Sequence, residues 1–253
     1  MDFSNKYVLG FAFGLCLICS ALVSATAVAL KDKQDANRLL DQRRQVIRVA
    51  ALVDGSNPLL PADVDTIFQE IESLVIDRET GEYLDVSVDV VNPIKEAKKP
   101  DLSTKTPKEF KSSGVSRLPN RLEVFEVKVA GKECVVLPIH GKGLWSTMYG
   151  YLALEKDLST VVGITFYAHG ETPGLGGEID NPKWKAQWTG RSVYENGEVE
   201  LGVVKASAPR DKAFQVDGLS GATITTKGVD ATIKLWLGPA GYGPYLQKLK
   251  ARG

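Results

Sequence analysis

Residues 122–139, LEVFEVKVAGKECVVLPI, indicate the fold of this chain more directly than any other stretch. Apolar and polar side chains alternate over residues 122–129, which is the period of a strand with one face in a core. Residues 130–132, AGK, supply a turn, and a second apolar run follows at 133–139. Two such runs joined by a short glycine-containing turn predict a β-hairpin, and therefore an antiparallel sheet.

Further strand-like runs lie on both sides of this hairpin. They are predicted at residues 84–91, 148–154, 161–167 and 198–205. The charged residues 93–114 include two prolines and show no apolar period, so a loop is expected there. A turn is expected at residues 156–157, between two of the strands.

Four helices are predicted in the part of the chain that contains these strands. The first helix is expected to be capped by Asp63 and to end at Thr80 and Gly81, because apolar residues recur at helical intervals between them. Another begins with Pro182 at its first position. The four expected helices cover residues 63–79, 181–188, 226–237 and 242–249. Strands and segregated helices together predict an α+β domain, with an antiparallel sheet and flanking helices.

The N-terminal residues 7–30, YVLGFAFGLCLICSALVSATAVAL, carry no charge. A bilayer core of about 30 Å needs roughly 20 apolar residues in a helix, so the length favours a transmembrane anchor. The small residues 25–27 also resemble the cleavage site of a signal peptide, and a buried helix of a soluble protein is the third alternative. Residues 31–53 continue the helix with polar character, and 55–58, GSNP, end it.

This pattern divides the chain into three parts. Residues 1–30 are expected to form a short tip and the single transmembrane helix, 31–60 a helical stalk and linker, and 61–253 the α+β domain. Only Lys6 precedes the apolar run, whereas six basic residues follow it: Lys31, Lys33, Arg38, Arg43, Arg44 and Arg48. The positive-inside rule alone would therefore place the domain in the cytoplasm.

Charge and composition exclude several classes of protein. The 31 basic and 31 acidic residues leave no field of one sign, so nucleic acid is not an expected partner. Three cysteines are too few for a disulfide scaffold, and no metal-ligand spacing is present, so no metal site is predicted. Cys16 and Cys19 share a helix face and could ligate iron or copper jointly with a partner, although small apolar residues are common in membrane helices.

Residues 217–229, DGLSGATITTKGV, are the first candidate binding segment. Gly221 and Ala222 remove side-chain bulk, so a large planar ligand could approach the backbone. The stretch precedes a predicted helix, whose N-terminus is a natural seat for phosphate. Its hydroxyls, of which one could instead cap the helix, belong to Ser220, Thr223, Thr225 and Thr226.

Residues 169–177, HGETPGLGG, are the second candidate segment. Their glycines allow the loop to lie flat against a ligand, with Glu171 and Thr172 as polar contacts and Leu175 as an apolar one. The alternative is an ordinary glycine-rich turn. Trp145, in a separate turn, could pack on a planar ring or belong to the core.

Residues 220–225, SGATIT, resemble the S-G-A-T-x-T signature of the covalent FMN-binding domains, and 169–176, HGETPGLG, resemble the E-T-P-G-L-G loop that lies beside the flavin in that family. The resemblance implies that Thr225 carries FMN as a phosphoester, and that Asp217 belongs to the motif read by the attaching flavin transferase. The other cofactor-binding residues that it implies are Ser220, Gly221, Ala222, Thr223, Glu171, Thr172, Gly174, Leu175, Gly176 and Trp145.

The resemblance covers nearly the whole chain, the anchor included. It is nearest to the C subunits of Na⁺-translocating NADH:quinone reductases, with the G subunits of Rnf complexes second. It implies an FMN-carrying electron-transfer subunit of a six-subunit inner-membrane complex that oxidises NADH, reduces ubiquinone and exports Na⁺. Electrons would come from a membrane-embedded iron centre and pass to the FMN of a neighbouring subunit. The residues of this chain are not expected to include an acid–base catalyst.

The resemblance also implies a periplasmic domain, against the charge count. We follow the resemblance, because long domains translocate largely regardless of flanking charge. No GxGxxG fingerprint or set of CxxC pairs is present in the sequence, so NADH oxidation is expected in another subunit. Two other classes stay open: a stand-alone membrane-anchored periplasmic flavoprotein, and an assembly subunit without flavin, against which the intact Thr225 argues.

Overall fold

The computed structural model describes residues 4–53, 59–129, 131–205 and 211–252. The chain divides into two compact units, Met1–Arg43 and Arg44–Gly253. Helix α1 (Asn5–Val49) makes up the described part of the first unit and supplies the first residues of the second. The predicted turn at 55–58 lies outside the described residues.

The apolar part of α1 has the length and composition of a membrane-spanning helix. An 18-residue window within it has a mean hydropathy of 2.3, and its large apolar side chains are exposed. This exposure contradicts the alternative of a buried helix in a soluble core, because such a helix covers its apolar residues. The predicted polar continuation of the helix is confirmed as far as Val49.

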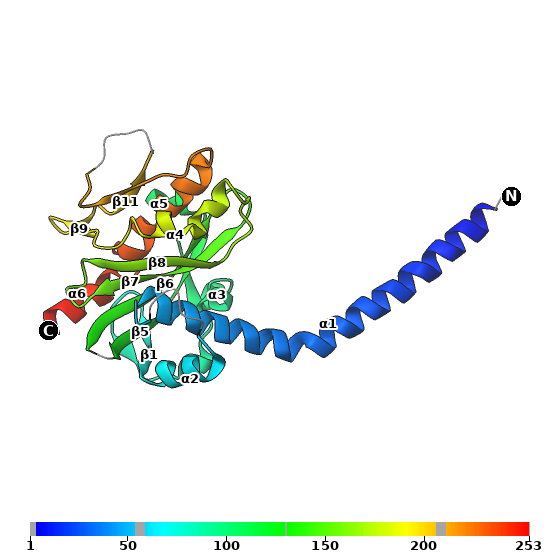
Figure 1. The fold of residues 1–253 in the computed structure, drawn as a ribbon, viewed down its shortest axis with the longest axis horizontal. Coiled ribbons are helices and arrows are strands. Elements are labelled where there is room, and N and C mark those ends of the chain that lie inside the picture. Colours follow the sequence, from blue (N-terminus) through cyan, green and yellow to red (C-terminus); the bar gives the residue numbers. More distant parts are fainter. Residues whose placement is uncertain (1–3, 54–58, 130, 206–210, 253) are drawn as a thin grey trace. The chain divides into compact units, whose positions relative to one another are not determined.

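Within the described residues of the second unit, six strands form one sheet in the order β2-β1-β5-β6-β7-β8, and all neighbours are antiparallel (Figure 1). The strands are β1 (Ile71–Asp77), β2 (Tyr83–Leu84), β5 (Arg121–Val129), β6 (Lys132–Lys142), β7 (Thr147–Glu155) and β8 (Val161–Ala168). The predicted hairpin is β5–β6, in which Gly131 has φ +76°. The predicted strands at 148–154 and 161–167 are also confirmed.

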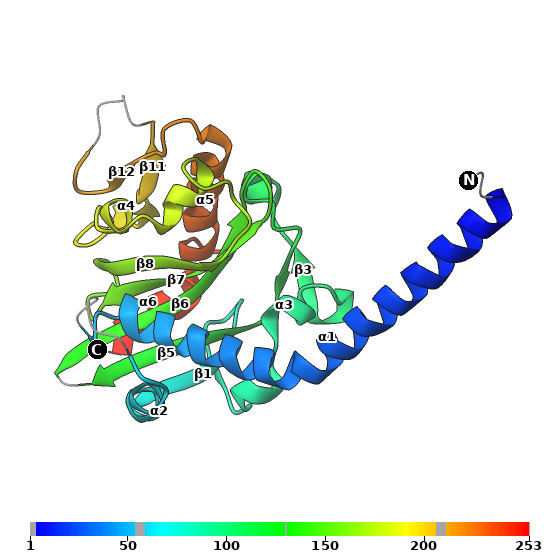
Figure 2. The same cartoon turned by 45° about the vertical axis from the view of Figure 1, so that its right-hand side comes forward.

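The sheet separates two layers, visible in Figures 1 and 2. Helix α5 (Thr223–Leu237) packs on one face, and its buried Val229 and Ile233 join the strand residues of the main core. Side chains alternate across a sheet, so Phe125 and Thr165 lie on the other face. There Phe125 meets Phe68 of α2 (Pro61–Gln69) at 5.9 Å between ring centroids, and Thr165 donates a hydrogen bond to Gln45 at the end of α1.

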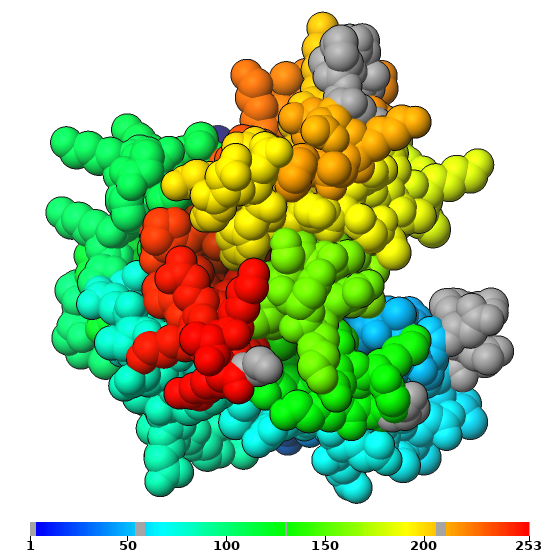
Figure 3. All heavy atoms as spheres, turned by 90° about the vertical axis from the view of Figure 1, so that its left-hand side faces the viewer, coloured from blue at the N-terminus to red at the C-terminus, as the bar shows by residue number. Residues whose placement is uncertain are grey.

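Short elements complete the domain around this sheet. They are α3 (Pro93–Glu96), α4 (Pro182–Lys185), α6 (Gly243–Arg252), β3 (Ser103–Lys105), β4 (Arg117–Pro119), β9 (Tyr194–Glu195), β10 (Glu198–Val199), β11 (Gly202–Val204) and β12 (Gln215–Asp217). Figure 3 shows α6 (red) on the surface beside the β9–β10 hairpin (yellow), and the two elements line one groove. The predicted strand at 198–205 is divided between β10 and β11, and the three C-terminal predicted helices correspond to α4, α5 and α6.

The predicted helix at 63–79 is wrong beyond Gln69. Its second half is strand β1, which pairs with β5 along its whole length. Apolar residues at 71, 74 and 75 fit helical spacing, but pairing with the edge of the hairpin determines their conformation. Asp63 is not the cap either: Leu60 is the N-cap, and the Asp63 carboxylate accepts a hydrogen bond from the Leu60 N–H at 3.2 Å.

The predicted strand at 84–91 is also wrong. Strand β2 ends at Leu84, and a 3₁₀ turn follows at Val88–Val90. Ser87 caps that turn by accepting a hydrogen bond from the Asp89 N–H, which ends the extended conformation. The loop predicted at 93–114 contains α3, β3 and the 3₁₀ turns Pro100–Leu102 and Lys108–Ser113, so it is more ordered than expected.

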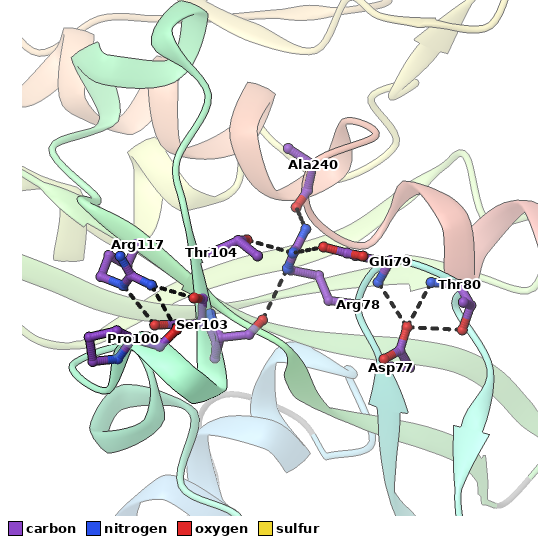
Figure 4. A network of polar contacts seen from close by, with 10 residues as sticks. Asp77, Arg78, Glu79, Thr80, Pro100, Ser103, Thr104, Arg117 and Ala240 are labelled. Carbon is purple, nitrogen blue, oxygen red and sulfur yellow. Dashed lines mark hydrogen bonds and ion pairs between the residues drawn. The ribbon is translucent and has the colours of Figure 1, made fainter.

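A buried arginine joins three parts of the domain on the side of β1 (Figure 4). Arg78, 6% exposed, donates hydrogen bonds to the carbonyls of Pro119 and Ala240, both at 3.0 Å, and to Thr104 Oγ1 at 2.7 Å. It also pairs with the exposed Glu79 at 3.0 Å. These bonds connect the end of β1 with β3, β4 and the loop between α5 and α6.

Candidate functional site

Thr225 lies in the first turn of α5, and its side chain is buried. The N-cap of this helix is Ala222, which offers no side-chain cap. The alternative that Ser220 or a neighbouring threonine caps the helix in the usual way is therefore wrong. Thr226 Oγ1 instead accepts a hydrogen bond from the Leu219 N–H at 3.0 Å, which fixes the turn before the helix. The first-turn N–H groups of a helix favour an anionic ligand.

Glu171 joins the two candidate segments to each other. Thr225 Oγ1 donates a hydrogen bond to Glu171 Oε2 at 2.6 Å, although the two residues are 54 positions apart. Backbone N–H groups of a third segment hold the same carboxylate: Leu144 donates to Oε2 at 3.0 Å, while Trp145 and Ser146 donate to Oε1 at 2.9 and 3.1 Å. Both oxygens thus accept two hydrogen bonds each among the described residues.

The ionisation state of Glu171 follows from these contacts. Burial raises the pKa of the Glu171 carboxyl, but the hydrogen bonds from Thr225 and from the turn at 144–146 outweigh burial, so its pKa lies below the ordinary value. Glu171 is therefore a carboxylate at neutral pH. It acts as an acceptor of hydrogen bonds from three backbone N–H groups and one hydroxyl.

Glycines let the three segments approach one another closely. A Cβ on Gly176 would lie 2.6 Å from Thr225 Oγ1, and a Cβ on Gly143 would lie 2.6 Å from the carboxyl carbon of Glu171. Gly221 has φ +73°, and a Cβ added to it would lie 3.0 Å from Leu175 Cδ2. At these positions a side chain would push the segments apart, so the small residues have a packing role.

Exposed apolar side chains come from the same three segments. Trp145 is 67% exposed, which shows that the alternative of a core residue is wrong. The other exposed side chains of this set are those of Leu144, Leu175 and Ile224. Large apolar side chains exposed together on one surface are typical of an interaction site.

The remaining predicted residues have other positions. Ser220, Gly221 and Thr223 are exposed in or beside the turn that leads into α5. The Thr172 side chain is exposed, and its carbonyl accepts hydrogen bonds from the Leu175 and Gly177 N–H groups, so it shapes the loop. Gly174 has φ +76°, a conformation that glycine adopts without strain.

Three further residues contribute to the site, and the sequence had assigned none of them an individual role. Ser146 donates its N–H to Glu171, and its Oγ accepts from the Gly170 N–H at 2.6 Å. His169 Nδ1 accepts from the Glu171 N–H, and Nε2 lies 2.7 Å from Asp180. The Trp184 indole N–H donates to the carbonyl of Asp217 at 2.7 Å and so positions the start of the 217–229 stretch. His169 belongs to the predicted segment 169–177 and Ser146 directly follows Trp145, whereas no site role was predicted for Trp184.

Comparison with known proteins places this geometry in a family. The family model described as "FMN-binding domain" matches residues 143–238, which contain both candidate segments and the turn at 144–146. The C subunit of the Na⁺-translocating NADH-quinone reductase of Vibrio vulnificus (strain YJ016) is 42% identical over 252 residues, covering 99% of this chain and 97% of its own. That of Pseudomonas aeruginosa is 42% identical over 254 residues, covering 98% and 97%.

The chain belongs to the family of these C subunits. The crystal structure of NqrC from Shewanella oneidensis has a TM-score of 0.74 and 32% identity, and covers 83% of this chain and 97% of its own. The crystal structure of the corresponding protein from Parabacteroides distasonis has a TM-score of 0.68 and 28% identity, with coverage of 86% and 96%. The resemblance inferred from two short motifs and the predicted α+β class are thereby confirmed. The named relatives are C subunits, which favours this assignment over the Rnf-type alternative.

Proposed function

We propose that this chain is the FMN-carrying electron-transfer subunit of a Na⁺-translocating NADH:ubiquinone reductase, and that it holds FMN as a phosphoester of Thr225. One observation carries the proposal: Thr225, in the N-terminal turn of α5, donates its hydroxyl to Glu171 of the second candidate segment at 2.6 Å. Exposed apolar side chains from the three segments that meet at Glu171 offer surface for a ring. This arrangement suits a cofactor with a phosphate at one end and a planar ring at the other.

The residues present fit such a group. FMN supplies the redox chemistry when it is bound. The first-turn N–H groups of α5 favour the negative charge of a phosphate. Trp145 and Leu175 offer apolar surface to a ring, and Ala222 and the neighbouring Gly221 keep side chains out of its way. A covalent bond at Thr225 prevents loss of the cofactor and leaves the ring free to exchange electrons.

The wider arrangement is part of the same proposal. Residues 1–30 contain the anchor, 31–60 the stalk and linker, and 61–253 the FMN domain on the periplasmic side of the bacterial inner membrane. Partners are the other subunits of a six-subunit complex, and a flavin transferase during maturation. The length and hydropathy of α1 support the anchor, and the family assignment supports the complex.

Replacing Thr225 with Val tests the attachment. Valine keeps the size of threonine but lacks the hydroxyl, so the chain should lose its flavin fluorescence in a denaturing gel and the FMN adduct in intact-mass measurement. Thr225→Ser should retain both. Thr189→Val is the control, because Thr189 donates its hydroxyl to the Val162 carbonyl in a different part of the domain. Fluorescence that persists in the Thr225→Val chain would show that the attachment site is elsewhere.

A further inference from the structure

The hydrogen bond between Thr225 and Glu171 belongs to the unmodified chain alone. Esterification of Thr225 Oγ1 removes the hydrogen that it donates, so this bond cannot hold the finished cofactor. The carboxylate is buried, with 5% of Glu171 exposed, and lies against the oxygen that becomes bonded to phosphorus. Any role of this contact therefore falls before or during attachment.

The carboxylate is also held rigidly in place. A carboxylate has about four acceptor positions; the turn at 144–146 occupies three of them, and Thr225 occupies the remaining one. The Glu171 backbone N–H is fixed in turn by His169 Nδ1 at 3.2 Å. Because its other acceptor positions are filled, the carboxylate presents a single direction to the hydroxyl, and the hydroxyl hydrogen points into it.

We infer that Glu171 is the proton acceptor for flavin attachment at Thr225. The inference rests on the proposed function. In protein kinases a carboxylate likewise accepts the proton of the attacking hydroxyl during phosphoryl transfer. Here the protein that receives the flavin supplies this group itself, and the flavin transferase supplies the donor.

The step is balanced as follows. The donor is a riboflavin phosphate in diphosphate linkage to a nucleotide. Thr225 Oγ1 forms a bond to the flavin-side phosphorus, the P–O bond of the diphosphate breaks, and the nucleoside monophosphate leaves with that electron pair as a dianion. The hydroxyl proton passes to Glu171 Oε2, and solvent later removes it. No redox change occurs, and the total charge is conserved.

Access of the donor requires movement of only part of the loop. Gly176 covers Thr225 Oγ1, at a distance where a Cβ would not fit. Three of the four residues in the covering segment 174–177 are glycines, which adopt a wider range of backbone conformations than other residues. Two hydrogen bonds to the Thr172 carbonyl, from the Leu175 and Gly177 N–H groups, hold this segment in place. Glu171 precedes this segment and is held by the turn at 144–146. Displacement of 174–177 therefore exposes Thr225 without removing its proton acceptor.

Attachment to the purified full-length chain tests the inference. The chain, prepared in detergent from a host without flavin transferase, is mixed with the transferase and flavin adenine dinucleotide, and adduct formation is followed by intact mass. Glu171→Gln keeps an acceptor oxygen but loses the charge, and the rate should fall about 10²- to 10⁴-fold. Glu171→Asp, which keeps the charge, should recover part of the rate. Glu178→Gln changes a nearby carboxylate that bonds to Asn181, and should react at the wild-type rate.

The pH profile separates a chemical role from a structural one. The ratio of wild-type to Glu171→Gln rates should be constant near neutral pH and decline towards one when acid protonates Glu171. The other charged or ionisable groups around the site are His169, Asp180, Lys142 and Lys227. They are present in both chains, so the ratio isolates the contribution of Glu171. Thermal unfolding of each variant confirms that it is folded.

Two results would overturn the inference while leaving the proposed function intact: equal rates for wild type and Glu171→Gln, or a rate ratio that does not change down to acid pH. A wild-type chain that is not modified at Thr225, by peptide mass mapping, would instead contradict the proposed function and with it the inference. If Glu171→Gln does not fold, the rates of Glu171→Asp and wild type still decide, because a role independent of the carboxylate's position predicts equal rates.

Discussion

Gly228, in the second turn of α5, sets how closely this helix approaches the sheet. A Cβ at Gly228 would lie 2.1 Å from the backbone oxygen of Lys142 at the end of β6. A carbon and an oxygen in contact need about 3.3 Å, so Gly228→Ala must move the helix and the strand apart by about 1 Å. The Cβ is bonded directly to the backbone of α5, and the oxygen belongs to the backbone of β6. No side-chain rotation can therefore relieve the overlap.

Three effects determine the stability of Gly228→Ala. Alanine gains about 1 kcal/mol of helix propensity. Overpacking costs typically about 1–3 kcal/mol. The displacement also stretches the bond from Thr225 to Glu171, because Thr225 lies one turn earlier on the helix and Glu171 is held by the turn after Lys142. A shift to about 3.6 Å abolishes that charge-assisted bond, which contributes about 1.5–3 kcal/mol. The net expected loss is about 1.5–5 kcal/mol, with a midpoint near 3 kcal/mol.

The measurement is thermal unfolding of the flavin-free chain in detergent, followed by tryptophan fluorescence. Trp184, Trp188 and Trp236 are buried in the domain, so the signal reports on the domain rather than on α1. A loss of about 3 kcal/mol should lower the Tm by about 6–12 °C in a domain of this size. Flavin attachment at Thr225 should slow as well, because the hydroxyl is displaced.

Lys234→Ala is the matched control for Gly228→Ala. Lys234 lies on the same helix, about half exposed, and pairs with Asp230 one turn away, so its replacement should change stability by less than about 0.5 kcal/mol. A Gly228→Ala chain as stable as wild type would refute the close approach of α5 to β6. A destabilised chain that attaches flavin at the wild-type rate would refute the coupling of that approach to Thr225.

Two predictions concern stability away from the site. Arg78→Met keeps the apolar stem but leaves the buried Pro119 carbonyl and the partly buried Ala240 carbonyl without their donor, so urea unfolding should show a loss of about 3 kcal/mol. Glu79→Gln, at the exposed end of the network, should cost less than about 1 kcal/mol. Burial, followed by the nearby Asp89 carboxylate, raises the pKa of Glu123 to about 7 in the folded state. The folded state therefore holds this proton more tightly than the unfolded state does. The resulting stabilisation is complete below the pKa of the unfolded state and is lost as the pH rises through 7. The free energy of unfolding of the wild-type chain, measured by urea titration, should therefore fall by at most about 3 kcal/mol between pH 5 and pH 8. A Glu123→Gln chain should lack this fall, and equal pH dependence in both chains would contradict the assignment.

The strands that the sequence predicts correctly are those whose pattern is local. In β5, β6, β7 and β8 the apolar period and the turns between neighbours lie within a few residues of each other, and each strand pairs with the next along the chain. Strand β1 pairs with β5 across more than forty residues, and its apolar positions fit two periods, so only the partner decides between them. The stretch at 84–91 has the opposite problem, because its alternation is clear but only Tyr83 and Leu84 pair with β1.

The candidate site divides in the same way. Short motifs identified Thr225 and the loop at 169–177, and the structure brings these two segments together. The partner of Thr225 could not be deduced, because the contact with Glu171 depends on how α5 is seated against the end of β6. The turn at 144–146 contributes backbone N–H groups, and a sequence pattern of side chains contains no information about their direction.

The glycines of the two motifs have a physical reason that neither motif shows by itself. Gly176 of one segment lies on Thr225 of the other, while Gly221 lies on Leu175 of the first, so each segment leaves out a side chain where the other places one. Gly143 does the same for Glu171 from the third segment. Because every contact joins two segments, a change in any one of these glycines moves a residue of another segment. The three segments therefore form one site mechanically, and its geometry depends on the seat of α5 as much as on the motif residues themselves.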